Sequence, residues 1–292
     1  EPGVRTGGPR RPPRFLWGPG PAPSLKIPSS YGKMKRIDLP EGGAAMGNPH
    51  ARRSGLDTLR GVTLVSMMAY HACWDLVYLF GRDWDWYHSF GAYLWQQSIC
   101  WTFILLSGYC FHLGRHRLRR GLMSLGGGVL VSVVAQLSGN PIHCGVLTLL
   151  GAGALITIPL DALLRRLPAR AGLAGSFALF FLTRDINRGY LGFEGARLLA
   201  LPEELYRNLY TAYLGFPGPD FSSADYFSLL PWLFLFWTGY FLYRMRPEGE
   251  RRELRLPLFT MLGRHSLLVY LLHQPVIYGA LWLLNQAAQG AP

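Results

Sequence analysis

Seven runs of apolar residues follow one another along the chain after residue 50, each bounded by charged or turn-forming residues. The runs are Leu59–Phe80, Phe90–Leu113, Leu122–Leu137, Cys144–Leu164, Leu167–Leu182, Tyr226–Tyr243 and Ser266–Leu284. Most reach the roughly 17–25 residues that a helix needs to cross the hydrocarbon core of a bilayer. The fifth run is the weakest, because its core is short and contains glycine. The pattern predicts an all-α membrane bundle of about seven transmembrane helices over residues 51–288.

Two segments lie outside this pattern. Residues 1–50 are rich in Gly, Pro and Arg without a hydrophobic period, so we predict a disordered tail. No short apolar run follows a charged start there, and we therefore expect no cleavable signal peptide. The connection from Thr183 to Asp225 is long, and its stretch Leu198–Tyr213 has some helical periodicity. Connections of this length are often functional.

The distribution of arginine predicts the orientation. Four arginines lie in Arg115–Arg120, three in Arg165–Arg170 and five in Arg244–Arg255, and these loops alternate with loops poor in positive charge. Since cytoplasmic loops carry the excess of Lys and Arg, we expect a cytoplasmic N-terminus, seven crossings and an outer 183–225 segment. The predicted location is a bacterial plasma membrane.

Composition supports a membrane protein and weakens the interpretation that the chain binds nucleic acid. Half of the residues are apolar, 16% are charged, and the mean hydropathy is +0.15, whereas soluble domains carry about a quarter charged residues. The net charge of +12 is compatible with a nucleic-acid partner, but no basic face or recognition motif accompanies it, so we expect none. The four cysteines lie in apolar runs, without the spacing of a disulfide framework or a metal site.

Ionisable groups inside the first run are the main candidates for chemistry, because such groups are costly within a membrane. His71 lies about 16 Å along the helix from Arg60, near the middle of the bilayer. Asp75 follows His71 by four residues and shares its helix face, so its carboxylate could orient the imidazole of a general base. The alternative is that both side chains only hydrogen-bond to neighbouring helices.

Further polar residues have both a structural and a functional interpretation. Asp57 and Arg60 fit either a favoured helix start with an orienting arginine, or an anchor for phosphates. His88 lies in the loop after the first run. It is either an exposed histidine without a catalytic role or a second candidate base at the outer surface. His273 precedes a proline by two residues, and such helix breaks either serve packing or line a cavity.

The segment from Arg53 to Leu64, with its Ser-Gly-Leu-Asp-Thr-Leu-Arg-Gly core and Met-rich continuation, resembles the opening of the heparan-α-glucosaminide N-acetyltransferase catalytic domain. The spacing from Arg60 to His71 also resembles the acyltransferase-3 class of membrane acyltransferases. Phe103–Gly108 and the closing Leu262–Pro275 are similar to further blocks in both groups. The resemblance covers about residues 53–285.

This resemblance implies that acetyl-CoA binds from the cytoplasm and that an amine or hydroxyl of an outer glycan accepts the acetyl group. In the acyltransferase-3 pattern the catalytic histidine corresponds to His71. In the heparan-α-glucosaminide N-acetyltransferase pattern the key histidine lies in the outer loop after the first span, and His88 is the closest residue here. Asp75 joins the predicted catalytic set through its spacing from His71. The implied CoA-binding residues are Asp57, Arg60, Ser107, Arg264, Ser266 and His273. No metal is expected.

We therefore interpret the chain as a membrane acetyltransferase with His71 as the first choice of base, Asp75 as its orienter, and Arg60 and Arg264 as cytoplasmic anchors. Two other functions remain open. A transporter would also use intramembrane His and Asp, although the sequence shows no internal repeat. A non-enzymatic membrane scaffold would bind a partner through the long outer loop.

Overall fold

The computed structural model describes residues 51–246 and 256–289, which form one compact unit of mostly helical structure. Within these residues the long helices are α1 (Ala51–Tyr78), α2 (Phe90–Tyr109), α3 (Arg117–Leu137), α4 (Val146–Arg166), α5 (Ala169–Leu182), α7 (Leu229–Arg244) and α9 (Ser266–Gln289). Short helices are α6 (Leu209–Leu214) and α8 (Pro257–Arg264), and the 3-10 turns are η1 (Asp85–His88), η2 (Cys110–Leu113), η3 (Ile186–Arg188) and η4 (Glu203–Leu205). The predicted tail lies outside the described residues.

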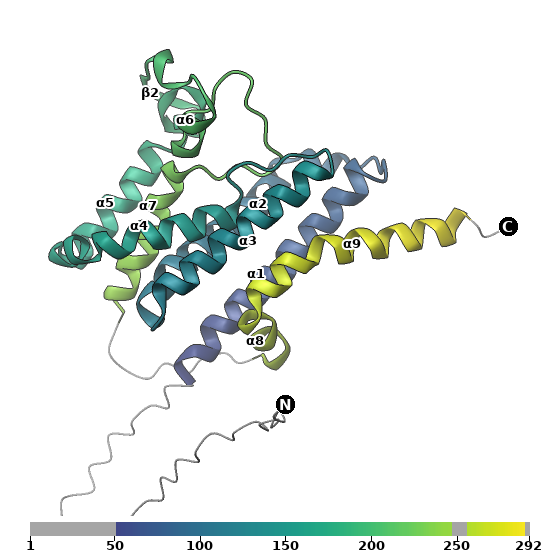
Figure 1. Cartoon of the computed structure of the whole chain (residues 1–292), viewed down its shortest axis with the longest axis horizontal. Helices are drawn as coiled ribbons and strands as arrows, with labels where there is room; N and C mark the ends of the chain where they lie inside the picture. The colour runs from purple at the N-terminus through teal and green to yellow at the C-terminus, as the bar shows by residue number, and fades with distance from the viewer. Residues whose placement is uncertain (1–50, 247–255, 290–292) are drawn as a thin grey trace, which may run out of the picture. The chain divides into compact units, whose positions relative to one another are not determined.

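The helices pack in pairs (Figure 1): α3 lies along α4, α5 along α7, and α7 also along α2. Helix α1 contacts α8, α9 and α2, so the first and last parts of the described chain lie together. Helix α8 lies at the end of the bundle where α1 begins, and α6 lies at the opposite end (Figure 1). The largest core cluster is aromatic and centres on Phe180, Phe236 and Tyr240, from α5 and α7.

Reciprocal glycines bring three helix pairs into backbone contact. A Cβ on Gly108 of α2 would lie 1.8 Å from the Phe236 carbonyl oxygen, and one on Gly239 of α7 would lie 2.0 Å from the Leu105 carbonyl oxygen. The α1–α8 and α3–α4 pairs repeat the arrangement with the glycines Gly61, Gly263, Gly128 and Gly151. Small residues allow the close approach that drives helix association in lipid. Gly108, the last residue of the Phe103–Gly108 block, is one of these contact points.

All seven predicted apolar runs are helical, but the number of membrane spans is not confirmed. Among the described residues, three helices are long and apolar enough to cross a membrane, namely Arg117–Leu137, Val146–Arg166 and Ser266–Ala288. Helix α5 has 14 residues and α7 has 16. At 1.5 Å per residue these rise about 21 and 24 Å, less than the hydrocarbon thickness. The predicted orientation stays a prediction.

The long connection between α5 and α7 corrects two expectations. It contains an antiparallel hairpin of β1 (Tyr190–Phe193) and β2 (Ala196–Ala200), so the described chain is mostly helical but not purely so. The predicted helical period over Leu198–Tyr213 is wrong for its first half, where β2 and η4 lie, and holds only at α6. Leu198 and Leu199 lie on β2 of the hairpin instead. Within the hairpin, Gly192 and Gly195 adopt positive φ, a conformation that glycine accepts readily.

Candidate functional site

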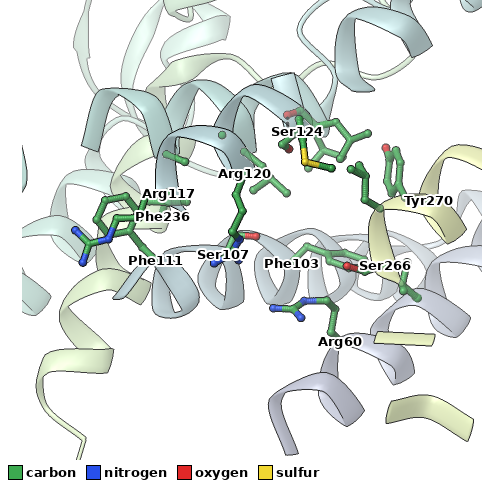
Figure 2. A pocket seen from close by; sticks show the side chains of 18 residues that line it. Arg60, Phe103, Ser107, Phe111, Arg117, Arg120, Ser124, Phe236, Ser266 and Tyr270 are labelled. Atoms are coloured by element: carbon green, nitrogen blue, oxygen red, sulfur yellow. Dashed lines mark hydrogen bonds between the residues drawn. The ribbon is translucent and has the colours of Figure 1, made fainter. Parts of the chain in front are cut away.

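A cavity of about 270 Å³ opens between helices from both halves of the chain. Its lining includes three residues predicted from sequence to bind the donor, Arg60, Ser107 and Ser266. Two further arginines, Arg117 and Arg120, lie on the same cavity (Figure 2). The remaining polar lining residues are Ser124 and Tyr270, and the other walls are apolar or glycine.

The arginines of this cavity are held in different ways. Arg60 donates to Asp57 at 3.0 Å and to the Cys110 sulfur at 3.3 Å, so its guanidinium is fixed beside α2. Arg117 donates to Asp161 at 2.7 Å, which offsets its charge. Arg120 lies against Gly114, where a Cβ would come within 2.1 Å of its Nη1. Figure 2 shows Arg60 and Arg120 on either side of Ser107. Guanidinium groups in this arrangement suit phosphate or other anionic oxygens.

Arg264, the other predicted anchor, lies beyond the cavity lining. Its Nε is 3.6 Å from the Asp57 carboxylate, and its side chain is 60% exposed. Asp57 thus joins the start of α1 to α8, next to a hydrogen bond of 2.7 Å between Thr58 and Thr260. The structure therefore places Asp57 between Arg60 and Arg264, where it organises the arginines.

His71 and His273 form a pair inside the bundle. Their ring centroids are 4.9 Å apart, although 202 positions separate them in the sequence. The Nδ1 of His273 lies 2.5 Å from the Tyr270 carbonyl oxygen and donates to it. Among the described residues, the His273 Nε2 has no hydrogen-bond partner. Tyr270 lines the cavity one helical turn before His273, so the pair lies about one turn of α9 beyond a residue of the cavity wall.

The hydrogen bond that the structure gives Asp75 goes to the neighbouring helix, and its orientation of His71 stays a prediction. The Asp75 side chain is fully buried, and its Oδ1 accepts a hydrogen bond of 2.5 Å from Gln274 of α9 rather than from His71. Residues four apart share a helix face, but the neighbouring helix α9 supplies the closer donor. Asp75 and Gln274 lie beside the two histidines in sequence and lock α1 to α9 at this level.

His88 stands apart from this pair. It ends η1 at the surface, exposed, with its ring 6.1 Å from Tyr78 and 6.0 Å from Tyr87. The structure therefore brings His71 and His273 together, pairs Asp75 with Gln274 close by, and leaves Arg60 on the cavity and His88 on the aromatic loop between α1 and α2.

Sequence reasoning missed Arg117, Arg120 and Tyr270. The two arginines belong to the Arg115–Arg120 run, which the sequence analysis used only to predict the orientation of the protein in the membrane. That use gave no reason to assign them to a binding site. Across residues 51–246 and 256–289, no three His, Cys, Asp or Glu side chains are grouped so that they could hold a metal ion.

Comparison with known proteins gives one match. The family model described as heparan-alpha-glucosaminide N-acetyltransferase, catalytic, matches residues 52–275. A search of curated proteins and a search of solved structures each gave no match. The matched range includes the cavity, the histidine pair and His88, and it covers most of the chain. The chain therefore belongs to the heparan-alpha-glucosaminide N-acetyltransferase catalytic family, whose members are membrane acetyltransferases that use acetyl-CoA.

Proposed function

We propose that this protein transfers an acetyl group from cytoplasmic acetyl-CoA to an amine or hydroxyl of a glycan on the other side of the membrane. The observation that carries the proposal is a cavity lined by three arginines, whose wall residue Tyr270 lies one helical turn before His273, the partner of His71. Phosphates and a reacting thioester need these two environments, one cationic and one that excludes water.

The size of the cavity limits what it holds. A volume of about 270 Å³ is at the small end of ligand pockets, so it suits the acyl-pantetheine part of CoA and leaves the nucleotide outside. Arg60 and Arg120 would then bind phosphate oxygens at the entrance, and Ser107 and Ser266 would hydrogen-bond the pantetheine amides. In this proposal Asp57 and Arg264 support Arg60, and His273 faces the acetyl end.

His71 is the proposed general base. It takes the proton that the acceptor's nucleophile loses on attacking the acetyl carbon, and returns it to the departing CoA sulfur. The paired His273, fixed by the Tyr270 carbonyl, presents the lone pair of Nε2 on the same side of the bundle. His88, at the exposed end of η1, would instead meet the arriving acceptor.

Two measurements test this function directly. Labelled acetyl from acetyl-CoA should appear on a glycan acceptor in membranes that contain the protein, and not in matched empty membranes. CoA should raise the melting temperature of the detergent-purified protein, because a ligand that binds the native state stabilises it. Absence of both effects would leave the transporter and scaffold functions.

Removal of the Arg60 charge should weaken CoA binding. We expect Arg60→Gln to raise the dissociation constant of CoA roughly 10- to 100-fold, the equivalent of one lost charge-assisted hydrogen bond. Arg264→Ala should have a smaller effect, because Arg264 reaches the site only through Asp57. The measurement is calorimetric titration of the purified variants with CoA.

Arg119→Gln is the matched control. Arg119 lies on α3 between the two cavity arginines, is exposed, and is not part of the cavity lining. The same loss of charge at that position should leave the dissociation constant of CoA unchanged. Equal weakening in both variants would mean that only the overall charge of the arginine-rich end matters, and would remove Arg60 from the donor site.

A further inference from the structure

Two non-helical segments run together where the long outer connection enters α7. The Phe227 amide donates to the Cys144 carbonyl at 2.7 Å, and the Ala224 amide donates to the Pro141 carbonyl at 3.1 Å. Ser223 adds side-chain bonds to the backbone of His143, at 2.9 and 3.0 Å. The connection before α4 and the connection before α7 therefore form one ordered unit around Asp225.

This unit reaches into the bundle. The Ser124 hydroxyl donates to the Leu147 carbonyl at 3.1 Å, so the first turn of α4 lies level with Ser124. Ser124 is seven residues along α3 from Arg117, a rise of about 10 Å, and four residues from Arg120, a rise of about 6 Å. Both Ser124 and Leu147 line the cavity.

Asp225 places a carboxylate at this point. Its Oδ2 accepts from the Val146 amide at 3.3 Å, and Val146 is itself a lining residue of the cavity. The half-buried carboxylate lies within electrostatic range of the Tyr270 hydroxyl on α9 and the Cys100 thiol on α2. Burial raises the pKa of the Asp225 carboxyl to about 6, so it can take up and release a proton near neutral pH.

We propose that Asp225 binds the nucleophilic amine or hydroxyl of the acetyl acceptor. The inference rests on the proposed function and deepens it, because it names the residue that receives the second substrate. The acceptor reaches Asp225 from the side of the 183–225 connection, while the donor enters from the arginines. Tyr270 is on the cavity wall, within electrostatic range of the Asp225 carboxylate, and its carbonyl accepts from His273, so it would lie between the two substrates.

With an amine acceptor, the Asp225 carboxylate accepts one of the two protons that the acceptor loses. An ammonium group must lose one proton before its nitrogen can attack, and Asp225 takes that proton. The nitrogen then forms a bond to the acetyl carbon, and the carbon–sulfur bond of acetyl-CoA breaks. The second proton of the nitrogen passes to His71 and then to the CoA sulfur, so CoA leaves as a thiol. Asp225 releases its proton to the outer water. A hydroxyl acceptor needs only the second transfer, with Asp225 as hydrogen-bond acceptor.

Asp225→Asn tests the inference in the full chain, with glucosamine as the acceptor and labelled acetyl-CoA as the donor. We expect kcat/KM for glucosamine to fall by roughly 100-fold or more, the usual contribution of a proton-accepting group. The dissociation constant of CoA should not change, because the Asp225 carboxylate is bound to the Val146 amide at the start of α4 and the donor is proposed to bind at the arginines. Asp220→Asn is the control, since Asp220 is an exposed carboxylate in the same connection and should behave as the unmodified protein.

The outcomes separate this inference from the function itself. If the unmodified protein neither binds CoA nor transfers acetyl, the proposed function fails. If it does both and Asp225→Asn keeps its kcat/KM for glucosamine, only the role of Asp225 is overturned. If Asp225→Asn does not fold, Asp225→Glu keeps the charge but moves the carboxylate by one methylene. At least a 10-fold loss of kcat/KM with unchanged CoA binding is then expected, and full activity would overturn the role.

Discussion

His71→Ala is expected to abolish acetyl transfer while the protein remains folded and binds CoA. His71 lies in the bundle beside His273, with ring centroids 4.9 Å apart, and His273 follows the cavity-lining Tyr270 by three residues. Loss of a general base costs typically 10²- to 10⁴-fold in rate. The assay is transfer of labelled acetyl in membranes with matched expression, together with stabilisation of the purified variant by CoA.

Two other variants distinguish His71 from its neighbours. His88→Ala should lower acceptor use but retain exchange of acetyl with CoA, because His88 lies at the exposed surface. Asp75→Asn should slow transfer less than His71→Ala, since Asp75 bonds Gln274 and leaves the histidine pair in place. Normal transfer by His71→Ala with complete loss in His88→Ala would move the chemistry to the aromatic loop. Normal transfer by both would remove the histidine mechanism.

Gly108→Leu is expected to prevent the native bundle from forming. Its Cβ alone would lie 1.8 Å from the Phe236 carbonyl oxygen and 3.1 Å from the Tyr240 amide, so α2 and α7 must separate. Overpacking ordinarily costs about 1–3 kcal/mol, and a clash with helical backbone cannot be relieved by a change of rotamer. The measurement is the yield of monodisperse protein in detergent and its melting temperature.

Gly126→Leu is the matched control for this prediction. Gly126 lies on α3, is exposed, and has nothing within 4 Å of an added Cβ. It should give the normal yield and melting temperature, since the new side chain projects away from the other helices. A Gly108→Leu protein that is as stable as Gly126→Leu would contradict the close approach of α2 and α7.

The sequence by itself determined the helical class, the position of the seven apolar runs, the family and the candidates Arg60 and His71. These features are local. The length of an apolar run predicts the length of a helix, and a motif is recognised from the spacing of its residues, so neither depends on which helices pack against it. The same reasoning could not count the spans. Helix length was overestimated where runs such as Leu167–Leu182 form helices shorter than the membrane is thick.

Tertiary structure alone decided which groups meet. The spacing of His71 and Asp75 shows that they share a face of α1, but only the position of α9 pairs His71 with His273 and Asp75 with Gln274. Such partners are about 200 positions away in sequence, and helix packing brings them together. The position of Asp225 next to Val146 was also decided by tertiary structure. It depends on where α4 begins beside α3, and the periodicity of a single segment does not predict that.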